Sequence, residues 1–361
     1  MSVLKKRKRH SSKEQRFIVS FESQIFVMDS QGVCQRRIER CTENTVLGHA
    51  DLNSNRLILY ESTPQNLRLC MVDITTDATY NTFVWQVELE KVLGVEYCEY
   101  QYAVSTNKKL FAINYGNDII CYNTYDGKIC MRKNINSAVF HVERLEFTPD
   151  QDRICVLYNN SESKDSDYGC FDGTDCLCVL SVNTHEECCT IRTILDGHFN
   201  SCDEYLYVTA NNVQVLSVRE FILNTTTLSY NGNVTRTKIK LLQKHTTVIR
   251  KFGNFVSLYD AVYGRIILYN TETHTMHNKT KCHVIPHIYQ MHRHDVFRRQ
   301  LSSDGKLCIG SGNRYMLVDI YSCRIIFTKT LDHPLRGIRM CNGHLFVWSK
   351  NNESPHVELM Q

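Results

Sequence analysis

Short apolar runs with period-two alternation recur along most of the chain, and this repetition restricts the fold more than any other feature. Each run is rich in Val, Ile, Leu, Tyr, Phe or Cys and closes on polar residues or a turn. Alternation with period two is typical of a strand with one buried face, whereas an amphipathic helix repeats roughly every 3.6 residues. The chain is therefore expected to be all-β. The seven runs that share this ending are residues 26–32, 69–73, 119–128, 178–184, 213–217, 266–273 and 315–321.

The spacing of these runs indicates a repeat architecture. Successive runs are separated by about 48 residues on average, and a period of roughly 20 to 50 residues is typical of units that bury their apolar faces by stacking on one another. Many short strands with this spacing favour a single β-propeller, in which radial sheets leave only short edges.

A second recurring element consists of a strand, a tight turn and another strand, at residues 147–156 and 301–312. In the later segment we expect Asp304-Gly305 to form the turn, because glycine readily adopts the positive φ that a tight hairpin needs. This segment is followed by Met316-Leu317-Val318-Asp319. Together they resemble the repeat of WD40 proteins, in which a Ser-Pro-Asp-Gly turn joins two inner strands ahead of a Trp-Asp strand.

Gly-His pairs extend this resemblance, because such a pair begins a blade in WD40 proteins. Gly48-His49 and Gly197-His198 precede strand pairs at a similar spacing, whereas Gly343-His344 is interpreted as a hairpin turn. The Trp-Asp position departs from the family and reads Met-Asp, Val-Asp, Tyr-Asn or Leu-Ser. The resemblance is thus to a degenerate WD40-repeat β-propeller. The spacing of the apolar runs follows the WD40 pattern over residues 15–349. The motif residues themselves match only near 147–183 and 301–330.

The number of strand elements predicts a seven-bladed propeller, with six or eight blades as the alternatives. The last strand pair is expected at Gly337 to Met340 and Leu345 to Trp348. We expect the first strands, at 17–21 and 25–29, to share one blade with this C-terminal pair and so to close the ring. The predicted organisation is a disordered basic arm at 1–14, the propeller at 15–349 and a C-terminal tail at 350–361.

The N-terminal arm contains the cationic run Lys5, Lys6, Arg7, Lys8 and Arg9. Such a run is typical of a nuclear localisation signal read by an import receptor, so we expect the protein to be nuclear. A non-specific phosphate-binding tail and an uninvolved solvated end are the alternatives. Because the net charge of the whole chain is only +4, the remainder is near neutral, and nucleic acid is expected only as a secondary partner.

Composition also limits the cellular setting that we expect. No stretch approaches the roughly 18 apolar residues of a membrane span, and the N-terminus lacks the apolar core of a signal peptide. We therefore expect no membrane partner and expect the 17 cysteines to be reduced.

Two clusters contain residue types that bind metals. One comprises His274, His277, His283, His287, His292 and His294 with Cys282, and the other Cys170, Cys176, Cys178, Cys188 and Cys189. Neither spacing matches a zinc framework of the Cys-x2-Cys and His-x3-His kind. We interpret the first cluster as a polar surface loop and the second as structural thiols, with a metal or redox site as the alternative. No cofactor is expected.

The sequence contains no nucleophile elbow, Walker loop, dinucleotide fingerprint or zincin helix, so no enzyme activity is expected. Resemblance to WD40 proteins implies a non-catalytic protein–protein interaction scaffold, here in a nuclear multi-subunit complex. One alternative is a substrate-recognition subunit of a cullin-type ubiquitin ligase, although only residues 215–219 resemble the motif of such subunits. The other is a nucleic-acid-associated propeller that uses the basic arm. Aromatic and arginine residues on exposed connections are the expected partner-binding residues, namely Tyr168, Phe171, Arg293, Arg298 and Arg299.

Overall fold

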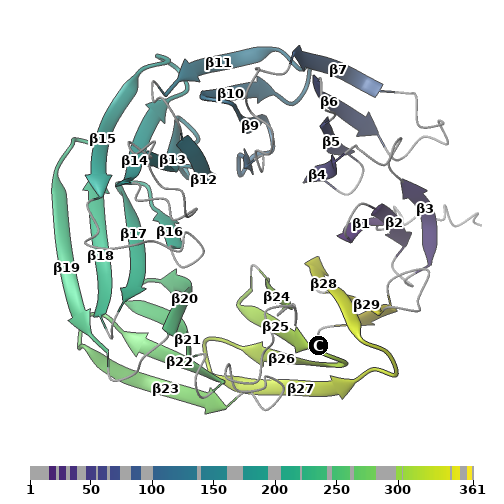
Figure 1. The fold of residues 1–361 in the computed structure, drawn as a ribbon, viewed down its shortest axis with the longest axis vertical. Coiled ribbons are helices and arrows are strands. Elements are labelled where there is room, and N and C mark those ends of the chain that lie inside the picture. The colour runs from purple at the N-terminus through teal and green to yellow at the C-terminus, as the bar shows by residue number, and fades with distance from the viewer. Residues whose placement is uncertain are drawn as a thin grey trace, which may run out of the picture.

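In the computed structural model, eight antiparallel β-sheets are arranged side by side around a common axis (Figure 1). The part of the chain that the structure describes contains no α-helix, and therefore none that could cross a membrane. The described residues are 16–21, 24–29, 33–38, 46–53, 56–62, 66–73, 83–90, 101–135, 140–160, 174–193, 205–219, 222–241, 246–260, 264–281, 298–302, 304–341, 344–349 and 356–359.

The sheets follow one another in chain order, and within each sheet neighbouring strands are consecutive in the sequence. The first four sheets contain β1 (Arg16–Phe21), β2 (Gln24–Asp29) and β3 (Cys34–Ile38); β4 (Val46–Asn53), β5 (Arg56–Ser62), β6 (Asn66–Asp73) and β7 (Phe83–Glu90); β8 (Tyr102–Val104), β9 (Leu110–Tyr115), β10 (Asp118–Asn123) and β11 (Ile129–Asn134); and β12 (Phe140–Phe147), β13 (Arg153–Asn160), β14 (Thr174–Ser181) and β15 (Glu187–Thr193).

The last four sheets contain β16 (Tyr205–Val208), β17 (Asn212–Arg219), β18 (Ile222–Ser229) and β19 (Val234–Lys240); β20 (Thr246–Phe252), β21 (Phe255–Asp260), β22 (Arg265–Asn270) and β23 (Thr275–Lys281); β24 (Arg298–Leu301), β25 (Lys306–Ser311), β26 (Arg314–Asp319) and β27 (Arg324–Thr330); and β28 (Leu335–Cys341), β29 (His344–Ser349) and β30 (His356–Leu359). The first strand of each sheet is the innermost and the last is the outermost (Figure 1).

The predicted all-β propeller is confirmed, and the recurring apolar runs are its middle strands. Five of the seven runs are third strands, whereas β2 and β17 are second strands. This mixture explains the irregular spacing of the runs along the chain. Both kinds of strand have neighbouring sheets on their two faces, so both are largely apolar; β10 and β22, for example, have four consecutive buried residues each.

The prediction of seven blades closed by a shared blade does not match the described sheets, which number eight. The N-terminal strands pair with β3, and the C-terminal strands pair with β30, so each end of the chain builds a sheet of its own. A third strand that is close in sequence costs less chain entropy to dock than one from the opposite terminus. Residues 356–359 lie in the segment that we expected to be a tail, and they instead form the third strand of the last sheet.

The ring is held together by apolar clusters that lie between consecutive sheets. One cluster joins the third and fourth sheets, through residues such as Cys121 and Cys178. Others lie between the second and third, fourth and fifth, fifth and sixth, sixth and seventh, and seventh and eighth sheets. Phe26 and Trp348 pack edge to face, with ring centroids 5.2 Å apart, and so join the first sheet to the eighth. Side-chain packing between separate sheets therefore closes the ring.

The expected Asp-Gly turn is confirmed at Gly305, which has a φ of 83° and donates its amide hydrogen to the Ser302 carbonyl over 3.2 Å. The ring of Tyr321 covers this turn closely, because a Cβ atom at Gly305 would lie 2.0 Å from it. The equivalent turn after β12 contains Gln151, which adopts the same left-handed conformation at a φ of 67°. The hairpin expected at Gly343-His344 agrees with the pairing of Cys341 with His344, and Gly48 and His49 lie in β4.

The two ends of the ring differ in the chain segments that they carry. We call the turn face the end that holds the turns between first and second and between third and fourth strands, such as residues 105–109 and 124–128. The connection face is the opposite end, where second strands turn into third strands, as at 116–117, and where each sheet leads to the next.

Candidate functional site

The turn between β10 and β11 is fixed on the turn face by a residue of the neighbouring sheet. Trp85 of β7 donates its indole Nε1–H to the Thr124 carbonyl oxygen over 3.0 Å. Gly127, with a φ of 70°, lets the indole ring approach, because a Cβ atom there would lie 2.7 Å from it. Thr124 Oγ1 in turn donates to the Lys108 carbonyl over 2.7 Å. These contacts link the second and third sheets and hold the turn rigidly.

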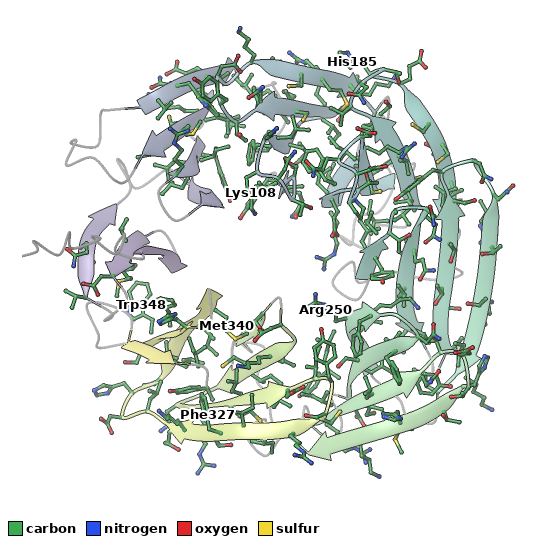
Figure 2. All side chains as sticks on the ribbon, turned by 180° about the vertical axis from the view of Figure 1, so that it is seen from behind. Lys108, His185, Arg250, Phe327, Met340 and Trp348 are labelled. Atoms are coloured by element: carbon green, nitrogen blue, oxygen red, sulfur yellow. The ribbon has the colours of Figure 1, made fainter. Side chains whose placement is uncertain are left out.

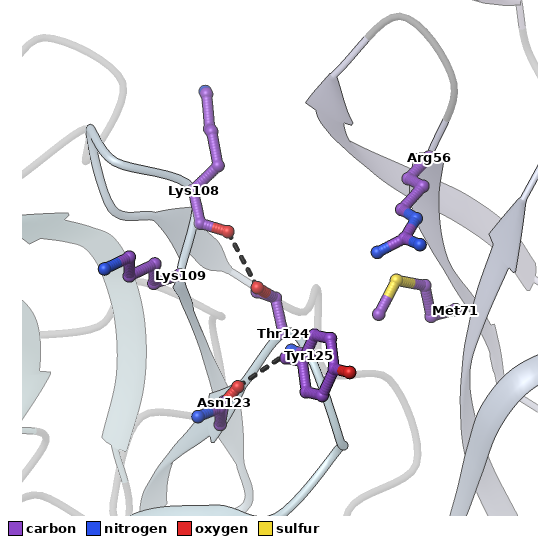
Figure 3. A pocket seen from close by; sticks show the side chains of 7 residues that line it. All are labelled: Arg56, Met71, Lys108, Lys109, Asn123, Thr124 and Tyr125. Carbon is purple, nitrogen blue, oxygen red and sulfur yellow. Dashed lines mark hydrogen bonds between the residues drawn. The ribbon is translucent and has the colours of Figure 1, made fainter.

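A pocket of about 410 Å³ opens beside this turn. Figure 3 shows Arg56 and Met71 from the second sheet on one side, opposite residues of the third sheet. The complete lining is Arg56, Met71, Lys108, Lys109, Asn123, Thr124 and Tyr125. Because the lining comes from two sheets, the pocket exists only when the two sheets pack together.

Electrostatically, the pocket favours an anion. Three of its seven lining residues are cations, and none is a carboxylate or a histidine. Lys108 and Lys109 are exposed and form no ion pair with any described residue. Met71 is buried and gives the pocket an apolar wall. The lining can therefore bind a negatively charged group that also has an apolar part.

Tyr125 stands at the edge of this pocket and is 79% exposed. Its backbone N–H donates to Asn123 Oδ1 over 2.8 Å, so the polypeptide around this ring is fixed. An exposed aromatic ring on a rigid turn is a typical anchor residue of protein interfaces, because it offers a large contact area at little entropic cost.

The first strands of the fourth and sixth sheets, β12 and β20, carry a second group of charged side chains. Arg144 and Glu146 of β12 are exposed, and Arg250 of β20 lies on the inner side of the sixth sheet (Figure 2). Arg250 Nη1 donates to the Ser302 carbonyl over 3.0 Å, which links the sixth and seventh sheets. Although Glu146 is accessible to solvent, the protein around it partly desolvates its carboxyl and so raises its pKa, and the charges of Arg144 and Arg250 oppose this shift.

Most residues that the sequence put forward for binding lie outside the described part of the chain. These are Lys5, Lys6, Arg7, Lys8 and Arg9 of the basic arm, and Tyr168, Phe171 and Arg293. Arg298 and Arg299 begin β24, where they pair with Gly310 and Ile309. The pocket contains none of the residues put forward.

The cysteine cluster does not converge, which agrees with its interpretation as structural thiols. Cys176 and Cys178 lie on the face of β14 that packs against the third sheet, whereas Cys189 packs on the opposite face, toward the fifth sheet. Burial raises the pKa of Cys189 to about 11 and that of Cys178 well above its ordinary value. Cys170 lies outside the described residues.

In the histidine cluster, only His274 and His277 belong to the described residues, and both are exposed. His277 packs against the ring of Phe255, with ring centroids 5.3 Å apart. His283, His287, His292, His294 and Cys282 lie outside the described residues. Within the described ranges, no three His, Cys, Asp or Glu side chains lie close enough together to hold a metal ion.

No protein-family model and no curated protein sequence matches the chain. Among solved structures, it is similar to the β-propeller BamB from Moraxella catarrhalis, with a TM-score of 0.55 and 11% identity over 93% of this chain and 91% of BamB. It is also similar to the β-propeller domain of Cps50 (Swd1) from Myceliophteria thermophila, with a TM-score of 0.50 and 9% identity over 84% of this chain and 94% of that domain. At such low identity the similarity concerns the backbone alone. The described sheets and both comparisons therefore agree that the chain has a β-propeller fold.

Proposed function

We propose that this propeller is a divergent WD40-type, non-catalytic protein–protein interaction scaffold of a nuclear complex. One partner inserts an acidic segment into the pocket between the second and third sheets. The observation that carries the proposal is the pocket itself, whose lining includes Arg56, Lys108 and Lys109 but no carboxylate, with Tyr125 held exposed at its edge.

The contacts around the pocket support recognition of a partner over chemistry on a substrate. The lining residues include no carboxylate, imidazole or thiol that could act as a general base or nucleophile. A rigid turn with an exposed tyrosine and nearby cations matches the composition of interface hot spots, which are enriched in Tyr and Arg. The basic run Lys5 to Arg9 supports entry into the nucleus through an import receptor.

The test is affinity purification of the full-length chain from nuclear extract, followed by mass spectrometry. The pocket variant is Lys108→Glu/Lys109→Glu, and the matched control is Arg314→Glu/Arg324→Glu, which makes the same change in charge at exposed positions of the seventh sheet. We expect the pocket variant to lose at least one stable partner that the control retains. Retention of every partner by the pocket variant would refute the pocket as an interface.

A photo-crosslinking amino acid in place of Tyr125 identifies what enters the pocket. We expect crosslinked partner peptides to be rich in Asp, Glu or phosphorylated residues, and the yield to fall when Lys108→Glu/Lys109→Glu is added. Crosslinks to neutral or basic peptides would contradict the proposed ligand class. If the captured partners are cullin adaptors, the alternative assignment as a ubiquitin-ligase subunit replaces the general scaffold.

The nuclear part of the proposal has its own test. Replacement of Lys5, Lys6, Arg7, Lys8 and Arg9 by Gln in a fluorescent fusion is expected to abolish nuclear accumulation. An unchanged distribution would show that the basic run is not the import signal.

A further inference from the structure

The charge of this chain is divided unevenly around the ring. Residues 205–281, which include the fifth and sixth sheets, contain ten Lys and Arg residues but only three Asp and Glu residues, a net charge of +7. The arm at 1–14 has six cations and one carboxylate. Since the whole chain has a net charge of +4, all other residues together have a net charge of −8. The near-neutral total therefore conceals one strongly basic sector.

Within this sector, carboxylates are few and unevenly placed. Residues 221–259 contain no Asp or Glu at all. Asp260 is completely buried and forms an ion pair with Arg265 at 2.9 Å. Glu272 is exposed, but it lies in the turn that follows β22 of the sixth sheet, where Asn254 Nδ2 donates to it over 2.6 Å. The fifth sheet therefore carries its exposed Lys238 and Lys240 with no carboxylate among its described residues.

The outermost strand of the fifth sheet, β19, displays this charge in a regular row. Arg236, Lys238 and Lys240 alternate along it and are all exposed. Alternate residues of a strand lie on one face about 6.7 Å apart, close to the distance between successive phosphates of an extended nucleic-acid strand. Lys238 and Lys240 form no ion pair with any described residue. The strand β19 lies on the outer rim of the ring (Figure 1).

The neighbouring side chains fit phosphates better than they fit a protein surface. Lys238 pairs across the sheet with Asn224, so the two side chains lie on the same face. Amides of this kind share phosphate contacts with Lys and Arg in nucleic-acid complexes. The row lacks the buried aromatic anchors that dominate protein interfaces.

We propose that the outer surface of the fifth sheet, centred on Lys238 and Lys240 of β19, binds the phosphate backbone of nucleic acid. This surface is separate from the pocket between the second and third sheets, so the ring would hold a protein and a nucleic acid at two different places. The two sites can therefore be tested separately.

The test measures binding of a fluorescein-labelled, single-stranded RNA of mixed sequence by anisotropy over a series of salt concentrations, with DNA of the same sequence in parallel. The full chain is used throughout, with Lys5, Lys6, Arg7, Lys8 and Arg9 replaced by Gln to remove binding by the arm. The site variant is Lys238→Glu/Lys240→Glu, and the matched control is Arg314→Glu/Arg324→Glu. Circular dichroism and thermal unfolding confirm that all proteins fold equally well.

In the site variant we expect binding to weaken by about tenfold or more at constant salt. The slope of log K against log salt should become shallower by about 1.4, because each lost phosphate contact on a single strand contributes about 0.7. The control should retain the affinity and the slope of its parent. Equal loss in both variants, or no loss in the site variant, would overturn the proposal. Equally tight binding of polyglutamate at the same charge concentration would overturn it in favour of an acidic protein partner.

Discussion

At the scale of single residues, the turns show how far local sequence dictates conformation. Two turns of the same kind lie after β12 and after β24, yet one uses Gln151 and the other Gly305 at the left-handed position. A residue with a Cβ is tolerated at Gln151 because side chains support its turn, among them Arg153, which donates to Asp150 Oδ2 over 3.0 Å. At Gly305 the space is taken by Tyr321, so there the glycine is required by packing as well as by φ.

This difference predicts the cost of adding a methyl group at two glycines. Gly305→Ala should lower the free energy of unfolding by about 3 kcal/mol, because left-handed strain and a clash with Tyr321 add together. Gly312 has a φ of 58°, but no atom lies within 4 Å of the position that a Cβ would take there, so Gly312→Ala should cost only about 1 kcal/mol. Chemical denaturation of both variants measures the difference, and equal losses would show that Tyr321 does not restrict the turn.

At the scale of elements, short apolar runs identify the middle strands far better than the outer ones. Middle strands are buried on both faces and are apolar over most of their length, as in β26, where Tyr315, Met316, Leu317 and Val318 are all buried. Outer strands are mostly exposed, so packing imposes little pattern on them, and β27 is exposed at nearly every position. The strand β30 has only four residues, too few to show a clear pattern, which is why they look like part of a tail in the sequence.

Deletion of β30 tests whether this short strand completes the last sheet. A chain that ends at residue 350 should lose about 2 kcal/mol of stability, because β29 loses the partners that pair with His344, Leu345, Phe346 and Val347. A chain that ends at Leu359 keeps β30 and should differ from the full chain by less than about 0.5 kcal/mol. Thermal unfolding at matched concentration compares them, and identical midpoints would mean that β30 adds nothing to the ring.

At the scale of the whole molecule, the ring is closed by contact between the first and the eighth sheet. No strand of the described first sheet pairs with a strand of the eighth, so closure depends on packing such as that of Phe26 on Trp348. Figure 2 shows Trp348 on the eighth sheet, on the side of the first sheet. Trp348 is only 5% exposed, and the chain contains just two tryptophans. With Trp85→Phe in the background, the emission of Trp348 therefore reports on closure alone.

In that background, Phe26→Ala should cost about 3 to 5 kcal/mol and shift the emission of Trp348 to longer wavelength in the native protein, because water reaches the seam between the two sheets. Phe111→Ala is the control, since Phe111 is equally buried but packs between the second and third sheets. It should destabilise the protein by a similar amount and leave the native emission unchanged. The same spectrum for both variants would show that Phe26 is not part of the closure.

The sequence by itself determined the all-β class, the repeat and the middle strands, because burial on two faces forces long apolar runs onto each repeat. It also determined the Asp304-Gly305 turn, whose φ depends on neighbouring residues only. Tertiary structure alone decided the number of sheets, since pairing of Ile25 with Ile38 and of Phe346 with Val357 leaves no local sign in composition. It also decided the pocket, because Arg56 and Lys108 lie about 50 residues apart in the sequence and meet only when two sheets pack. Long-range contacts of this kind depend on the geometry of the ring, and no short stretch of sequence encodes them.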